Sequence, residues 1–146
     1  MKDRKRIAEV LIVLNLAFIW GNSLVSGTDS GHLSGSILAW LNALLGLGPE
    51  SAALLHLLIR KVAHFTEFAC LGALLCWRWR LSARKLPVLY PALLGMAAGL
   101  VDETIQLFTP DRGPSLTDVW IDTSGAAAGI LLLLLWHHLT KRKHNQ

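Results

Sequence analysis

Charged residues are scarce in this chain. Asp, Glu, Lys and Arg together make up 16% of its 146 residues, whereas soluble domains average about 25%. Apolar residues reach 53%, and the mean hydropathy is +0.45. This balance excludes an ordinary soluble domain and indicates an integral membrane protein with one domain over residues 1–146. The pI is about 9.4. No nucleic-acid partner is expected, because the basic residues of a membrane protein mark its cytoplasmic side.

Cysteine is also rare, and two familiar enzyme spacings are missing. Cys70 and Cys76 are the only cysteines; they fall in one expected helix and lack the CxxC spacing. They imply neither a disulfide nor a redox compartment, and we expect both to be buried and inert. The DDxxD and HExxH spacings of metal-dependent enzymes are absent, so the sequence leaves open whether the chain is an enzyme.

Four segments have about 20 mostly apolar residues, the length that a spanning helix needs. They lie at roughly 7–25, 56–77, 86–108 and 118–139. Between the first two, apolar residues recur at helical spacing over 31–46, but this segment is too short and too polar on one side to span. We expect it to be an amphipathic helix on the membrane surface, with an ordinary buried helix as the alternative. The expected fold is therefore all-α and polytopic, with four transmembrane helices plus one interfacial helix.

Lys and Arg cluster in three short segments. Eleven of the 14 basic residues lie at the N-terminus, in the segment 78–85 and in the C-terminal tail. With four spans, all three segments fall on one side, and Lys and Arg mark the cytoplasmic side of a membrane protein. We therefore expect both termini to be cytoplasmic. The alternative is that the N-terminal segment is a cleaved secretory signal, which would leave three spans.

Three motifs place charged residues inside the expected spans: RKVAHFTE at 60–67, DETIQ at 102–106 and DVWID at 118–122. A charge at bilayer depth costs about 2.5–3.5 kcal/mol or more, so such residues usually face a protein interior and mark function. At about 1.5 Å per residue, all three motifs fall in the outer half of the bilayer. We therefore expect one polar layer with ten candidate ligand-binding residues: Arg60, Lys61, His64, Glu67, Asp102, Glu103, Gln106, Arg112, Asp118 and Asp122.

The charges of this layer do not balance. Its three cations, Arg60, Lys61 and Arg112, stand against six acids, namely Glu67, Asp102, Glu103, Asp111, Asp118 and Asp122. Each surplus acid needs water, a proton or a bound cation, so the imbalance favours a site open to the outside over a closed set of ion pairs. Lys61 and Glu103 lie about 100° around their helices from the other members, and we expect them to face lipid head groups.

Small residues continue the polar side of the last expected span. Gly125 and Gly129 follow Asp118 and Asp122 at helical spacing in the segment GAAAG. Small residues four positions apart allow a second helix to approach closely. We therefore expect this side of the helix to face the bundle rather than lipid.

The three motifs together resemble the VanZ-like family of membrane proteins. RKVAHFTEFACLGALL at 60–75 is similar to the family's Arg-Lys-x-x-His-Phe-x-Glu-Tyr block, with Phe68 in place of the usual tyrosine. DETIQLFTPDRGPSLTDVWIDTSGAAAG at 102–129 is similar to its Asp-Glu-x-x-Gln-x-Phe-x-Pro-Gly-Arg block and the Asp-x-x-x-Asn/Asp-x-x-Gly that follows, with Asp111 where the family often has glycine. NSLVSGTDSGHLSG at 22–35 resembles the serine-rich stretch after the family's first helix.

This resemblance implies a small multi-pass protein of the bacterial cytoplasmic membrane, with the lipid bilayer as its partner. The family's founding member is associated with resistance to teicoplanin, a lipid-bearing glycopeptide antibiotic. The resemblance supplies no biochemical mechanism and no oligomeric state.

Four functions are compatible with the polar layer. The first is a binding or accessory protein of the cell envelope, in which Arg60, Lys61 and Arg112 hold the phosphate or carboxylate of a lipid-linked precursor or a lipoglycopeptide. The second is an intramembrane enzyme acting on lipid or lipid-linked phosphate. The third is transport or proton coupling, and the fourth is a structural layer of ion pairs.

The enzyme hypothesis has its own candidate residues. His64, Asp102 and Glu67 have the side-chain types of a general base or nucleophile with an orienting carboxylate. No cofactor is predicted, and Mg²⁺ is a secondary option because Asp102, Asp118 and Asp122 offer the oxygen ligands that it prefers.

Overall fold

The computed structural model describes residues 2–82, 88–110, 112–113 and 115–144, and within these ranges the protein is helical with no strand. Five helices follow one another: α1 (Lys2–Leu24), α2 (Gly27–Leu45), α3 (Pro49–Arg80), α4 (Leu89–Gln106) and α5 (Leu116–His144). The all-α class predicted from the sequence is confirmed.

Two helices, α1 and α5, are long and apolar enough to cross a membrane by length and composition. They correspond to the first and last of the expected spans. The other two expected spans lie mostly within α3 and α4, which contain the charged motifs at 60–67 and 102–106. Those charges lower the hydropathy of both helices, so the four-span arrangement stays a prediction.

The helix α3 is longer than the span expected within it. It begins at Pro49 rather than near residue 56 and has 32 residues, which is about 48 Å at ~1.5 Å per residue. Proline suits the first turn of a helix, where its missing N–H is not needed. Before it, Gly46 ends α2 at a backbone φ of 61°, a left-handed conformation that glycine adopts without strain. The length of α3 exceeds the about 30 Å thickness of a bilayer core.

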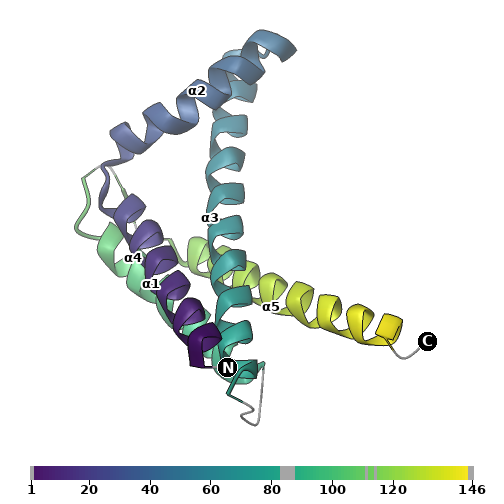
Figure 1. The fold of residues 1–146 in the computed structure, drawn as a ribbon. Helices are drawn as coiled ribbons and strands as arrows, with labels where there is room; N and C mark the ends of the chain where they lie inside the picture. Colours follow the sequence, from purple (N-terminus) through teal and green to yellow (C-terminus); the bar gives the residue numbers. More distant parts are fainter. Residues whose placement is uncertain (1, 83–87, 111, 114, 145–146) are drawn as a thin grey trace.

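The central helix is α3, which contacts each of the other four helices. Figure 1 shows α1 beside α4, with α3 crossing between them and α5. The chain runs up α1, down α3 and up α4, and α5 then runs across the view toward the lower right. The N-terminus, the C-terminal end of α3 and the C-terminus therefore all lie toward the lower part of Figure 1. The three basic segments of the sequence belong to these ends.

Glycines allow α3 and α5 to pack backbone against backbone. A Cβ added at Gly125 would overlap the carbonyl oxygen of Phe65, and one at Gly129 would overlap that of Ala69. Gly72 on α3 has the same relation to the carbonyl oxygen of Ala126. The small side of α5 thus faces the bundle, as the GAAAG segment predicted.

The apolar core lies where α1, α3 and α4 meet. Ile19, Phe68, Leu71 and Ala98 are buried together, and Trp20 packs against them while donating a hydrogen bond of 3.4 Å to the carbonyl oxygen of Ala98. Phe68 is fully buried. This packing joins the end of α1 to the two helices that carry the first two motifs.

Two smaller expectations have different outcomes. α2 covers the segment expected to lie on the membrane surface, and its Trp40 and Leu44 are 68% and 70% exposed, which leaves apolar surface uncovered. Cys76 is buried as predicted, but Cys70 is exposed. The prediction for Cys70 was wrong because this position lies on a side of α3 that no neighbouring helix covers.

Candidate functional site

The three charged motifs meet in one region of the structure, where they are joined by the C-terminal end of α1. α3 contributes its middle turns, α4 its last turns and α5 its first turns. α1 contributes Asn22 and Ser23, which hydrogen-bond Glu67 on α3 and Asp102 on α4. The polar residues divide into three groups that differ in burial and in their partners.

The first group forms a pocket between α3, α5 and the turn before α5. This pocket, which we call the basic pocket, has a volume of about 240 Å³, and it is lined by Leu57, Arg60, Lys61, His64, Arg112, Gly113, Asp118 and Ile121. Among the described lining residues, three are cations and one is an acid. Lys61 Nζ lies 2.6 Å from Asp118 Oδ1, so this carboxylate already has a partner.

Arg112 closes the basic pocket from the turn between α4 and α5. Its Nη2 donates a hydrogen bond of 3.0 Å to the carbonyl oxygen of Asn22, while its buried Nε has no hydrogen-bond partner among the described residues. Burial, and then the positive charge of Arg60, lower the pKa of the Arg112 guanidinium from its ordinary value. Both effects indicate an environment that an added negative charge would make more favourable.

The second group is a buried network around Asp102. Ser23 Oγ donates to Asp102 Oδ1 at 2.6 Å, and Gln106 Nε2 donates to Asp102 Oδ2 at 2.7 Å. Thr109 Oγ1 in turn donates to the carbonyl oxygen of Ser23 at 2.8 Å. All four residues are buried. Neutral donors therefore satisfy a carboxylate that lies deep between α1 and α4.

Two further acids are also held by uncharged donors. Glu67 Oε1 accepts a hydrogen bond of 3.3 Å from Asn22 Nδ2, and Glu103 Oε2 accepts one of 2.6 Å from the backbone N–H of Ser115. Glu103 is only 6% exposed. The expectation that Glu103 faces head groups was wrong, because the chain after α4 folds back and places the backbone of Ser115 against its side chain.

Lys61, which was also expected to face head groups, lines the basic pocket beside Arg60 and His64 and pairs with Asp118 in the first turn of α5. Asp111, which the sequence placed among the acids of the layer, lies outside the described residues.

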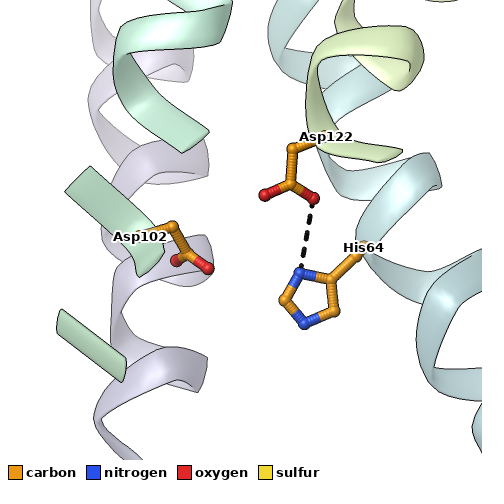
Figure 2. A group of neighbouring side chains, drawn as sticks. All are labelled: His64, Asp102 and Asp122. Atoms are coloured by element: carbon orange, nitrogen blue, oxygen red, sulfur yellow. Dashed lines mark ion pairs between the residues drawn. The ribbon is translucent and has the colours of Figure 1, made fainter. Parts of the chain in front are cut away.

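The third group consists of His64, Asp102 and Asp122, one from each of α3, α4 and α5. One donor atom from each lies within 4.8 Å of the others, and Figure 2 shows the three side chains pointing toward a common point. His64 Nδ1 lies 3.6 Å from Asp122 Oδ1, which is too long for a hydrogen bond. Both carboxylate oxygens of Asp122 are buried and have no hydrogen-bond partner among the described residues. We call these three residues the buried triad.

The structure thus sorts the candidates that the sequence grouped together. Arg60, Lys61, Arg112 and Asp118 line the basic pocket, whereas Asp102 and Asp122 lie deeper. His64 belongs to both places, since it lines the pocket and faces the two aspartates. Of the three candidate metal ligands, Asp118 is separated from the other two by its pairing with Lys61.

Sequence reasoning missed the neutral members of the layer, which are Asn22, Ser23, Thr109 and Ser115. Apart from Gln106, it considered only ionisable side chains and so had no place for hydroxyl groups, the Asn22 amide or backbone N–H donors. A signal was present, because Asn22 and Ser23 are polar residues that end an otherwise apolar helix.

Three comparisons with known proteins were made. A protein-family model described as VanZ/LLP1 matches residues 9–137. This range includes all three charged motifs and the polar end of α1. Neither curated proteins nor solved structures produced a match.

Proposed function

The chain belongs to the VanZ/LLP1 family, and from this premise we propose that it is a multi-pass protein of the bacterial cytoplasmic membrane that binds the anionic head group of an envelope amphiphile in its basic pocket. The ligand class comprises lipid-linked envelope precursors and lipoglycopeptides. Binding of the latter would contribute to glycopeptide tolerance.

Exposed apolar side chains support a topology in which α1, α3, α4 and α5 all cross the membrane and α2 lies on its surface. Apolar surface of this extent marks contact with a membrane or a partner. Each of the four helices exposes several such side chains: Val13, Leu14 and Phe18 on α1; Leu57, Leu58 and Val62 on α3; Leu93, Leu94 and Leu100 on α4; Leu131, Leu132 and Leu135 on α5. With the basic segments and both termini cytoplasmic, the polar layer falls in the outer half of the bilayer.

The observation that carries the proposal is the charge of the basic pocket. Among the described residues of the lining, Arg60, Lys61 and Arg112 accompany one acid, Asp118, which already pairs with Lys61. Neither guanidinium group pairs with a carboxylate among these residues. Guanidinium groups bind phosphate and carboxylate with two parallel hydrogen bonds, so an anion is the ligand that this lining favours.

The size and walls of the pocket favour a head group over a whole lipid. Its volume of about 240 Å³ is below the ~300–1,000 Å³ of pockets that enclose a drug-sized ligand. Leu57 and Ile121 line it beside the cations, and Leu57 is exposed. An anionic group can enter while its apolar chain stays among the lipids along α3.

The test is binding of a polyprenyl phosphate to the purified full-length protein in detergent micelles. Arg60→Gln and Arg112→Gln should each weaken binding about ten- to hundredfold, since a hydrogen bond to a charged group contributes about 1.5–3 kcal/mol. Arg78→Gln is the matched control, because Arg78 pairs with Glu9 far from the pocket. Binding by both pocket variants as tight as by the control would refute the proposal, provided that circular dichroism shows unchanged helicity.

One observation favours a second candidate, an intramembrane enzyme acting on lipid-linked phosphate. His64 lines the basic pocket and also faces the carboxylate of Asp122. An imidazole oriented by a carboxylate is a common general base or nucleophile, and here it adjoins the predicted anion site. Release of inorganic phosphate from a panel of lipid phosphates in reconstituted membranes would establish this reaction, and absence of product from the wild type would remove it.

A further inference from the structure

We propose that the buried triad, His64, Asp102 and Asp122, binds one divalent cation, with Zn²⁺ as the preferred ion. This inference concerns residues deeper than the cations of the basic pocket and does not depend on anion binding there. It rests on the geometry, the unpartnered state of Asp122 and the charge of the three side chains.

The geometry brings three donor atoms from three helices close to one point. The atoms lie within 4.8 Å of one another, and Figure 2 shows the imidazole and both carboxylates directed toward the space between them. Zinc binds nitrogen and oxygen at about 2.0–2.2 Å, so two ligand atoms of a tetrahedral ion lie ~3.4 Å apart. Rotation of the side chains that brings the donor atoms about 1 Å closer together would complete such a site.

Asp122 supplies an independent indication of a ligand. Its side chain is completely buried, and neither of its oxygens accepts a hydrogen bond from any described residue. His64 Nδ1 is also buried without a hydrogen-bond partner among these residues. A buried carboxylate without a hydrogen-bond donor is costly, and a cation between the three side chains would bind His64 Nδ1 and an oxygen of Asp122 at the same time.

Asp102 is oriented for metal binding by hydrogen bonds from its neighbours. Ser23 donates to one of its oxygens and Gln106 to the other, and each carboxylate oxygen has a second lone pair. Hydrogen bonds of this kind orient a metal-binding carboxylate and are a regular feature of metal sites. The position of Asp102 is therefore determined by its neighbours on α1 and α4.

The charge of the triad suits a divalent ion. Two carboxylates and a neutral imidazole carry a charge of −2, which one divalent cation balances. An ion pair between protonated His64 and Asp122 would balance only one of the two acids, and their separation of 3.6 Å is long for such a pair. The nearest cations of the layer line the basic pocket instead.

The ligand types favour zinc over magnesium. Imidazole suits zinc and its neighbours in the first transition row, whereas Mg²⁺ prefers oxygen ligands alone. The three acids that the sequence suggested for Mg²⁺ do not converge, since Asp118 pairs with Lys61. Three protein ligands also leave a fourth position on a tetrahedral ion, and because His64 lines the basic pocket, that position would lie beside it.

The test is direct binding of zinc to the full-length protein, purified without a histidine tag and titrated calorimetrically with ZnCl₂ after chelation. The wild type should bind one ion per chain and prefer Zn²⁺ to Mg²⁺. Asp122→Asn and His64→Gln should each weaken binding at least tenfold. Asp118→Asn should stay within about twofold of the wild type, which separates the triad from the set of acids that the sequence suggested.

Two further measurements keep the result interpretable. His137→Gln with His138→Gln should leave the zinc affinity unchanged, which excludes binding by these two histidines near the C-terminal end of α5. If Asp122→Asn fails to fold, His64→Gln decides, because His64 is partly exposed and its loss leaves the packing of α5 intact. Absence of stoichiometric zinc in the wild type, or equal affinity in both triad variants, would overturn the inference. Neither outcome affects the polyprenyl phosphate test when that test is also run on chelated protein, because its variants change only arginines.

Discussion

The contact between α3 and α5 makes a sharp prediction for Gly129→Ala. A Cβ at this position would overlap the carbonyl oxygen of Ala69 and lie 2.7 Å from its carbonyl carbon. The obstacle is backbone, which cannot rotate aside as a side chain can, so α5 must move away from α3. The residues that meet across this contact include His64 on α3 and Asp122 on α5, and the substitution therefore tests the scaffold of the site.

The expected loss of stability in Gly129→Ala follows from two opposing effects. Overpacking of a tight contact costs about 1–3 kcal/mol, and a backbone obstacle belongs at the upper end of that range. Alanine regains about 1 kcal/mol of helix propensity over glycine, which leaves a net loss of about 2 kcal/mol. For a chain of roughly this length, 1 kcal/mol corresponds to ~2–4 °C, so the midpoint of thermal unfolding in detergent should fall by about 4–8 °C.

The matched control for this prediction is Gly21→Ala on α1. A Cβ at Gly21 meets nothing within 4 Å, so the same chemical change should leave the midpoint unchanged or raise it slightly. Equal midpoints for the two variants would refute the close packing of α3 on α5. In that case the placement of Asp122 beside His64 would lose its basis.

Three further predictions concern the surroundings of the site. Ser23→Ala removes the donor of the 2.6 Å hydrogen bond to buried Asp102 and should lower the free energy of unfolding by about 1.5–3 kcal/mol, measured by thermal unfolding. Arg78→Gln breaks an ion pair with Glu9 that is largely exposed and should cost at most about 1 kcal/mol in the same assay. Gly113→Cys, in the exposed turn before α5, should react with a membrane-impermeant maleimide added to intact cells.

Two of these predictions have a control in the chain, and the third has a stated limit. Ser124→Ala removes an exposed hydroxyl that bonds the carbonyl oxygen of Ile121 and should change stability by less than about 0.5 kcal/mol; a loss equal to that of Ser23→Ala would contradict the buried network. If Arg78→Gln lowered the free energy of unfolding by more than about 1 kcal/mol, its ion pair with Glu9 would not be a weak surface pair. Ser82→Cys, at the end of α3, should react only in permeabilised cells. Labelling of Ser82→Cys but not of Gly113→Cys in intact cells would contradict the topology. Cys70 and Cys76 are replaced by serine in both labelling variants.

Much of the fold could be predicted because each helix has a strong local signal. Apolar runs of spanning length indicated α1 and α5, and helical spacing indicated α2. The extent of α3 was underestimated because the expected span was limited to the about 20 residues that cross a bilayer. Gly48 just before the helix and Pro49 at its first position were the better guide to its start, since Pro at the first position is a typical beginning.

The convergence of the charged motifs could be predicted from depth and helical spacing, but the pairing within the layer could not. Counting charges left three acids without a partner, and the sequence interpretation assigned them to water, protons or cations. In the structure, Ser23, Asn22 and the backbone N–H of Ser115 each donate a hydrogen bond to one of three acids, while Glu103 Oε1 stays buried without a hydrogen-bond partner among the described residues. Such neutral donors come from segments distant in the sequence, and only the tertiary fold shows where they lie.

The remaining imbalance is therefore more local than the sequence implied. Cations gather in the basic pocket, whereas the unpartnered oxygens of Asp122 lie in the buried triad. The sequence predicted one surplus of negative charge over the whole layer. The structure instead has two neighbouring sites, one lined by cations and one lined by acids. One favours an anion and the other favours a cation, and His64 belongs to both.

The most direct test of the central claim compares two ligands that differ only in the head group. Polyprenyl phosphate and the corresponding polyprenol have the same apolar chain, so any difference in their affinity for the wild-type protein reports recognition of the anion. Recognition by Arg60 and Arg112 predicts at least tenfold tighter binding of the phosphate, and this preference should disappear in Arg112→Gln. Equal affinity of the wild type for both ligands would contradict an anion site in the basic pocket.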